Sequence, residues 1–157
     1  MDWPVQIVES SDASALSGVK ELWTEYCQWA GLSPDFQDFA GELRTLPGKY
    51  SRPDGGLLLV QIDGKPAGTA AFRPLSKSAC EAKRLYVRTA YRRQGMAGAL
   101  LTKLIEEARR CGYKDLYGDT LPIMNSALVL YREMGFMEVG PYADNPTPDA
   151  IYMHLGL

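Results

Sequence analysis

Histidine and cysteine, which often bind metals or act in catalysis, are scarce in this sequence of 157 residues. The three cysteines, Cys27, Cys80 and Cys111, form neither a CxxC pair nor a cluster with histidine, which argues against a disulfide scaffold and a zinc site. The single histidine, His154, lies among residues that alternate as in a strand, which favours a structural role over a catalytic one. We therefore expect no metal in this protein.

The sequence also lacks long apolar runs and an excess of positive charge. No segment approaches the roughly 20 apolar residues of a membrane-spanning helix, and the first ten residues lack the basic and apolar regions of a secretory signal. We therefore expect a cytoplasmic protein without a membrane partner. Lysine and arginine total 17 against 19 aspartate and glutamate, so a net charge of -2 provides no field to hold nucleic acid.

The length and the ordinary globular composition predict a single domain over residues 1–157. Apolar periodicity predicts strands over residues 5–9, 56–62, 66–72, 79–87, 116–120 and 150–155, with one further strand of unassigned bounds before the last. It predicts helices over residues 12–26, 33–46 and 125–134, and another that opens in the glycine-bearing stretch 88–98 and closes at Cys111-Gly112. Asp63-Gly64 is typical of a hairpin turn, and Asn125 or Ser126 is expected to cap the last helix. The element order, β-α-α-β-β-β-α-β-α-β-β, predicts an α/β layer fold with a mixed sheet and helices on both faces.

The segment YRRQGMAGAL, residues 91–100, lies between a predicted strand and a predicted helix. A helix N-terminus presents unpaired N–H groups and a partial positive charge, and the small residues Gly95, Ala97 and Gly98 would let a phosphate approach the backbone. The alternative is a tight strand-to-helix turn and nothing more. The motifs GxxxxGK(S/T) and GxGxxG are both absent, so neither a P-loop nor a dinucleotide site is predicted.

Two patterns in the second half of the chain carry more information. Arg92, Gly95 and Ala97 form R-x-x-G-x-A, and residues 125–136, NSALVLYREMGF, carry N-x-x-A-x-x-x-Y-x-x-x-G-F. Both resemble motifs of the GNAT family, the Gcn5-related N-acetyltransferases, whose acetyl-CoA motif is (R/Q)xxGx(G/A), with glycine commoner than alanine at the last position. The resemblance runs over about residues 57–155. It implies a GNAT-like three-layer α/β fold, with a mixed central sheet of about six to seven strands flanked by about four α-helices.

The resemblance implies an acyltransferase that uses acetyl-CoA as co-substrate and acetylates the primary amine of a small molecule. Main-chain groups of Leu85, Tyr86 and Val87 would line the pantetheine arm where the sheet splays after Val87. The residues of the first motif would surround the pyrophosphate: Arg92, Arg93, Gln94, Gly95, Met96, Ala97 and Gly98. Asn125 would steady the cofactor, and Tyr131 would lie beside the thioester sulfur.

An amine acceptor is mostly protonated at neutral pH, so the reaction needs a proton acceptor, directly or through water. Glu81 is the candidate, because it lies eleven residues before Arg92, where GNAT members with a glutamate base tend to carry it. The alternative is a strand-edge glutamate that lies in water or pairs with Lys83 or Arg84. Tyr131 is the candidate general acid for the CoA thiolate, since its phenol can protonate a thiolate; the alternative is a packing tyrosine.

Cys80 and Cys111 have apolar or small neighbours and are expected to be buried, which argues against an acetyl-cysteine intermediate. Direct attack of the amine in a ternary complex is the expected mechanism. The first two helices, the turn after the strand 66–72 and the loop 141–150 are expected to line the acceptor pocket, with candidates Trp23, Tyr26, Phe36, Arg73, Arg84 and Tyr142. Core packing is the alternative for the aromatic residues, and solvent exposure is the alternative for the arginines.

Two other functions stay open, a protein lysine or N-terminal acetyltransferase and a non-catalytic acyl-CoA-binding regulatory module. An acidic chain without a basic tail favours a small amine over proteins bound to nucleic acid. The presence of both Glu81 and Tyr131 argues against a pure binding module, which needs neither. The last strand, if exposed, could pair across a homodimer.

Overall fold

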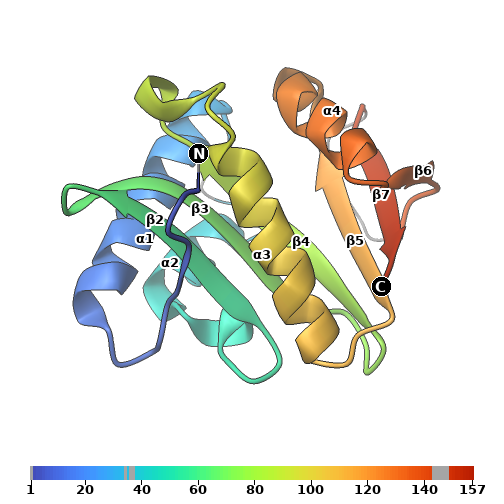
Figure 1. Cartoon of the computed structure of the whole chain (residues 1–157), viewed down its shortest axis with the longest axis horizontal. Helices are drawn as coiled ribbons and strands as arrows, with labels where there is room; N and C mark the ends of the chain where they lie inside the picture. Colours follow the sequence, from blue (N-terminus) through green and yellow to red (C-terminus); the bar gives the residue numbers. More distant parts are fainter. Residues whose placement is uncertain (1, 34, 36–37, 143–148) are drawn as a thin grey trace.

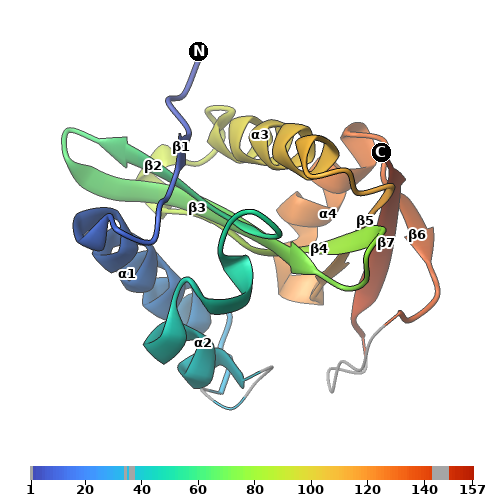
Figure 2. The ribbon, with the colours of Figure 1, turned by 90° about the horizontal axis from the view of Figure 1, so that it is seen from below.

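The computed structural model describes residues 2–33, 35, 38–142 and 149–157. These residues form a seven-stranded sheet in the order β1-β2-β3-β4-β5-β7-β6, with helices on both faces (Figures 1 and 2). The strands are β1 Gln6–Ile7, β2 Gly56–Ile62, β3 Lys65–Pro74, β4 Ala79–Val87, β5 Asp115–Thr120, β6 Met137–Val139 and β7 Ile151–Gly156. The α-helices are α1 Ala13–Trp29, α2 Phe39–Thr45, α3 Met96–Arg110 and α4 Asn125–Glu133, and the 3-10 helices are η2 Gly48–Tyr50, η3 Thr89–Tyr91 and η4 Pro122–Met124. The predicted element order and the mixed sheet are confirmed.

A hydrophobic core lies on each face of the sheet, between the strands and the helices that cover that face. Figure 2 shows α1 and α2 on one face and α3 and α4 on the other. The helix α3 buries Leu100 and Leu104, which recur at helical spacing, whereas α1 and α2 bury Leu22, Trp23 and Phe39 on the opposite side. The central strands are therefore held between two packed layers. In the described part of the chain, no helix is both long enough and apolar enough to cross a membrane.

The sheet is mainly antiparallel in its first half. β2 and β3 form the predicted hairpin, and its turn residues Asp63 and Gly64 have φ values of 53° and 77°, the positive angles that a tight two-residue hairpin requires. β4 pairs with β3 in antiparallel orientation and with β5 in parallel orientation. β7 then pairs antiparallel with both β5 and β6. The β4–β5 pair is the parallel step that positions the site.

Some local predictions differ from the structure. β1 covers only Gln6–Ile7, because only these two residues pair with β2. The predicted cap of α4 at Asn125 or Ser126 is wrong: Asn125 is the first helical residue, it follows η4 directly, and no side chain caps the helix. The predicted start of the second helix near Ser33 lies partly outside the described residues. α2 begins at Phe39 and ends at Thr45, close to its predicted end.

Candidate active site where two parallel strands separate

β4 and β5 separate within the sheet. Their parallel pairing ends at Ala82 and Gly118, although β4 continues to Val87. Near this point Arg84 has a φ of 59°, and the register of β4 against β3 shifts in a bulge. The bulge bends β4, so the strands separate after Ala82. The resemblance implied a separation after Val87, so that expectation is corrected. The last residues of β4 therefore lack a neighbouring β5 strand.

The loop before α3 has the conformation that an anion site requires. Arg93 and Gly95 have left-handed φ values of 61° and 84°, and α3 begins at Met96. No side chain caps this helix, so the N–H groups of its first turn are open to a ligand. Such a helix N-terminus attracts phosphate through its N–H groups and its dipole.

A cleft of about 390 Å³ opens beside this loop, and we name it the loop cleft. Its lining residues are Trp29, Leu85, Tyr86, Val87, Tyr91, Arg92, Arg93, Gly95, Met96, Ala97, Gly98, Ile123, Met124, Ser126, Ala127 and Leu130. The predicted cofactor residues are therefore brought together, except for Gln94, Asn125 and Tyr131. The Gln94 carbonyl instead accepts a hydrogen bond from Trp3 Nε1 at 2.9 Å, and Asn125 is an exposed residue at the start of α4.

The Arg92 side chain is fixed against one wall of the loop cleft. Its Nε donates to the carbonyl oxygen of Val87 at 2.7 Å. Its guanidinium carbon lies 4.9 Å from the ring centroid of Trp29 and 5.4 Å from that of Tyr86. These contacts hold a positive charge beside the loop, and Arg92 forms no ion pair with a carboxylate within the described part of the chain.

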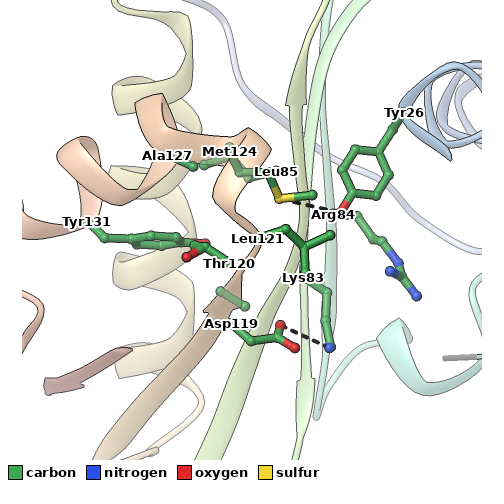
Figure 3. Close-up of a pocket in the computed structure, with 11 residues that line it drawn as sticks. Tyr26, Lys83, Arg84, Leu85, Asp119, Thr120, Leu121, Met124, Ala127 and Tyr131 are labelled. Carbon is green, nitrogen blue, oxygen red and sulfur yellow. Dashed lines mark hydrogen bonds and ion pairs between the residues drawn. The ribbon is translucent and has the colours of Figure 1, made fainter. Parts of the chain in front are cut away.

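A narrow cavity of about 30 Å³ lies where β4 and β5 separate, and we name it the junction (Figure 3). Tyr26 from α1 and Tyr131 from α4 reach it from opposite sides of the sheet. The junction shares Leu85, Met124 and Ala127 with the loop cleft. The junction therefore adjoins the loop cleft.

Tyr131 is buried at the junction, with 4% of its surface exposed. Its hydroxyl lies close to β5, since a Cβ added at Gly118 would be 3.5 Å from Tyr131 Oη. Burial raises the pKa of Tyr131, and the negative charge of Asp119 raises it further. The phenol therefore stays protonated at neutral pH and keeps a proton that it can donate.

A second large pocket, of about 320 Å³, lies on the other side of the junction, and we name it the charged pocket. Its lining residues are Asp38, Glu42, Thr45, Pro47, Gly48, Lys49, Tyr50, Arg73, Glu81, Lys83 and Asp119. Lys83 and Asp119 also line the junction, where their side chains form an ion pair of 3.2 Å (Figure 3). The loop cleft, the junction and the charged pocket are thus neighbours, and each adjacent pair shares lining residues.

Glu81 is a buried carboxylate in the wall of the charged pocket, with 1% of its surface exposed. Arg73 Nε donates to its Oε1 at 3.1 Å, Lys83 Nζ lies 3.5 Å from Oε2, and the Tyr142 hydroxyl donates to Oε2 at 2.6 Å. Glu81 therefore does not lie in water, and it does pair with Lys83. Its role as a base stays a prediction. Burial and the negative charges of Asp119 and Glu81 raise the pKa of Tyr142, so this phenol stays a hydrogen-bond donor.

Glu42 of α2 joins two arginines above the same pocket. Its Oε1 accepts from Arg84 Nη2 and its Oε2 from Arg73 Nη1, each at 2.9 Å, and the Tyr50 hydroxyl donates to both oxygens at 3.0 Å. Arg84 is 4% exposed, so solvent exposure is wrong for this arginine. Since Arg73 also contacts Glu81, one chain of ion pairs runs from α2 to β4.

The remaining acceptor-site candidates have different surroundings. Trp23 is fully buried in the core beside α2, so it packs and does not line a cavity. Tyr26 lines the junction, and Tyr142 contacts Glu81 as described above. Phe36 lies outside the described residues.

Cys80 and Cys111 lie outside the loop cleft, the junction and the charged pocket. Cys80 is fully buried, and burial raises its pKa to about 12, so its thiol is a poor nucleophile. The predicted burial of Cys111 is wrong, because this residue ends α3 at the surface, where its Sγ contacts the Pro53 carbonyl at 3.1 Å. The Nε2 atom of His154, in β7, lies 2.7 Å from Oδ1 of Asp115, in keeping with the structural role that we predicted for this histidine.

The residues of the site that were not found from the sequence include Trp29, Glu42 and Asp119. Asp119 had a signal, because aspartate is unfavourable inside a strand and β5 alternates between buried and partly buried positions. Glu42 had none, since a glutamate on a short amphipathic helix usually faces water. Trp29 follows the apolar spacing of α1 but is exposed, so only the folded chain shows that it borders the loop cleft.

Comparisons with known proteins agree with this architecture. The family model described as the Acetyltransferase (GNAT) family matches residues 16–136. An uncharacterized N-acetyltransferase of Schizosaccharomyces pombe is 34% identical over 142 residues, which cover 89% of this chain and 87% of the relative. The chain therefore belongs to the GNAT acetyltransferase family, and its enzyme class is acyltransferase.

Solved structures show the same fold at low sequence identity. A GNAT family acetyltransferase of Staphylococcus aureus Mu50 has a TM-score of 0.80 at 20% identity, covering 98% of this chain and 99% of the other. A GNAT family acetyltransferase of Elizabethkingia anophelis with acetyl-CoA bound has a TM-score of 0.63 at 19% identity, covering 99% of both chains. The GNAT-like fold implied by the sequence motifs is thus confirmed.

Proposed function

We propose that this protein transfers the acetyl group of acetyl-CoA to a primary amine of a small molecule by direct attack in a ternary complex. The adjacency of the loop cleft, the junction and the charged pocket carries the proposal. Leu85 lies between the first two cavities, and Asp119 lies between the last two. A cofactor in the loop cleft and an amine in the charged pocket would therefore meet at the junction.

The loop cleft suits acetyl-CoA in shape and in charge. The open first turn of α3, the small residues Gly95, Ala97 and Gly98 and the nearby Arg92 fit a diphosphate. The backbone of β4 beyond Ala82 has no β5 partner, so its amide groups can pair with an extended, amide-bearing pantetheine as with another strand. Bound there, acetyl-CoA supplies the activated acetyl group.

The charged pocket suits the acceptor amine. The ammonium form first loses a proton to a carboxylate of this pocket, directly or through water, and the sequence position nominates Glu81. The free amine nitrogen then bonds to the thioester carbon and the carbon–sulfur bond breaks. Tyr131 protonates the leaving thiolate and takes back a proton from the new amide nitrogen, so one proton is released to solvent for each acetyl group transferred.

Two features support a small acceptor. The volume of the charged pocket, about 320 Å³, lies within the usual range for small-molecule sites. Its lining is rich in charged side chains that pair with one another, so a polar amine of limited size fits it best. A protein lysine or N-terminal acetyltransferase and a non-catalytic acyl-CoA-binding module are the alternatives.

We also propose that residues 1–157 act as one domain in the cytoplasm. Residues from α1 to β7 contribute to the two hydrophobic cores, which supports a single unit. The three cysteines are free, as expected in a reducing compartment. The last strand, β7, lies between β5 and β6 and has no free edge, so the expected pairing through this strand is wrong. A homodimer stays a proposal, with β6 as the edge strand available for pairing.

An amine screen tests the proposed function. CoA release is followed with acetyl-CoA and a panel of primary amines, which includes amino acids, polyamines and amino sugars, beside lysine-containing and free-N-terminal peptides. We expect saturable turnover with at least one small amine and with none of the peptides. Turnover with peptides alone would favour the protein acetyltransferase, and acetyl-CoA binding without any turnover would favour the regulatory module.

A further inference from the structure

The Glu42 carboxylate connects the two parts of the site that must be aligned for acetyl transfer. It contacts Arg84 in β4 and Arg73 in β3, each at 2.9 Å, and these residues are 42 and 31 positions away in the sequence. The Glu42 side chain is only 11% exposed. The position of α2 therefore fixes both guanidinium groups through one carboxylate.

Arg84 is held in an unfavourable backbone conformation. Its φ of 59° is left-handed, a conformation that is unfavourable for a residue with a side chain. The guanidinium also lies over the rings of Phe39 and Trp23, at 4.7 Å and 5.8 Å from their centroids. Strained residues persist only where their surroundings determine them strongly, and here those surroundings are Glu42 and the two rings.

The strain at Arg84 has a direct consequence for the acyl end of the site. Arg84 precedes Leu85, which lines both the junction and the loop cleft. Beyond the bulge the Arg88 N–H donates to Ala67 of β3 at 2.9 Å, whereas the Val87 carbonyl faces the opposite edge and accepts from Arg92. The bulge thus determines which main-chain groups of β4 face the cofactor cleft.

The second contact of Glu42 leads to the predicted base. Arg73 donates through Nη1 to Glu42 and through Nε to Glu81 Oε1, so one guanidinium bridges the two carboxylates. Arg73 is partly exposed on the charged pocket, whereas Glu81 is buried. Without Glu42, fewer contacts would fix the positions of the Arg73 guanidinium group and of the Glu81 carboxylate.

We propose that Glu42 is a positioning residue for acetyl transfer, which fixes the β4 bulge through Arg84 and the Glu81 carboxylate through Arg73. This role rests on the proposed function. In this role Glu42 acts through the two arginines: Arg84 holds the main chain at Leu85 against the thioester, and Arg73 holds the Glu81 carboxylate near the amine. Small displacements of such groups are costly, because a shift of about 1 Å can reduce a rate a hundredfold.

The test compares Glu42→Gln with Glu107→Gln. Glu107 of α3 is also a buried glutamate between two cations, Arg110 at 3.2 Å and Lys103 at 3.5 Å, and it lines none of the three cavities of the site. For folded Glu42→Gln we expect kcat to fall on the order of tenfold to a hundredfold, with the Kd of CoA unchanged. We expect Glu107→Gln to keep the wild-type kcat. A folded Glu42→Gln protein with kcat within twofold of wild type would overturn the proposal.

A second pair of variants separates the backbone from the charge at the bulge and serves if Glu42→Gln does not fold. Arg84→Gly removes the ion pair but permits positive φ, whereas Arg84→Ala removes the ion pair and disfavours positive φ. We expect kcat to decrease in the order wild type, Arg84→Gly, Arg84→Ala. An Arg84→Gly enzyme as fast as wild type would show that the pair with Glu42 has no positioning role.

A binding measurement separates failure of this role from failure of the proposed function. Calorimetry with acetyl-CoA and CoA needs no acceptor, and we expect Arg84→Gly and Glu42→Gln to weaken acetyl-CoA several-fold while CoA binds as before. One outcome is that wild type binds acetyl-CoA and that both variants keep the wild-type ratio of the acetyl-CoA affinity to the CoA affinity. This outcome overturns the positioning role, while the proposed function stands. If wild type does not bind acetyl-CoA, both are overturned.

Discussion

Ala82 of β4 and Gly118 of β5 form the last pair of the parallel ladder, and beyond them the two strands separate. The separation leaves a junction between a cleft lined by the α3 loop and a pocket lined by charged residues. The proposed chemistry depends on this one break in the sheet, and the predictions below test its parts separately.

The first prediction concerns the conformation of the loop before α3. Gly95 has a φ of 84°, and a Cβ there would meet no atom within 4 Å, so Gly95→Ala adds backbone strain of about 1 kcal/mol and a methyl group in the cleft. We expect acetyl-CoA binding to weaken at least tenfold. Gly64→Ala is the matched control, since Gly64 has a φ of 77° and equally open surroundings but lies in the β2–β3 turn. Equal losses of affinity in both variants would remove the loop from the cofactor site.

The second prediction concerns Tyr131 as general acid. Tyr131→Phe should retain acetyl-CoA binding and lower kcat by roughly a hundredfold, because the buried phenol is the proton donor to the thiolate. Burial raises the pKa of Tyr131, so in wild type kcat should not decline below about pH 10 through loss of this proton. The rate of CoA release, measured across pH for both proteins, checks this. An unchanged rate in Tyr131→Phe would assign the residue to packing alone.

The third prediction concerns the carboxylates of the charged pocket. Glu81→Gln should lower kcat on the order of a hundredfold, because the amine would lack its proton acceptor. Asp119→Asn is the comparison, since Asp119 shares Lys83 with Glu81 and also lines the junction. We expect the larger loss in Glu81→Gln. If kcat falls strongly in Asp119→Asn and stays close to the wild-type value in Glu81→Gln, Asp119 accepts the proton. Our assignment of Glu81 as the base is then wrong.

The fourth prediction concerns the cysteines. Cys80 is buried with a pKa raised to about 12, and Cys111 lies at the surface outside the site, so no acetyl-cysteine should form. Intact-mass analysis of the enzyme after mixing with acetyl-CoA alone should show no added acetyl group. Cys111→Ser should keep the wild-type turnover. A stable mass increase of one acetyl group, lost on addition of amine, would contradict direct transfer.

The order of elements and the loop cleft could be predicted from the sequence, because their signals are local. Leu100 and Leu104 recur at helical spacing, and Asp63-Gly64 is a strong hairpin signal. The part of the loop cleft that we propose for the pyrophosphate comes from one continuous segment, residues 91–98, so finding the motif located this part.

The charged pocket could not be predicted in the same way, because its residues come from elements that are distant in the sequence. Glu42, Arg73 and Asp119 lie on α2, β3 and β5, and only the packing of α2 over the sheet brings them together. The bulge at Arg84 is equally hidden, because nothing local requires a left-handed arginine inside a strand. Cys111 was misjudged since it is the residue at which α3 ends, where the direction of the side chain depends on the cap.

Calorimetric titration of the purified wild-type protein with acetyl-CoA tests the account most directly, with CoA and NADH as comparison ligands. We expect one site that binds acetyl-CoA with micromolar affinity and binds CoA with an affinity of similar size. We expect no heat of binding for NADH, because the α3 loop lacks the dinucleotide motif. Affinity for acetyl-CoA should be lost in Gly95→Ala and retained in Gly64→Ala. No detectable binding of acetyl-CoA to wild type would contradict the proposed function at its first step.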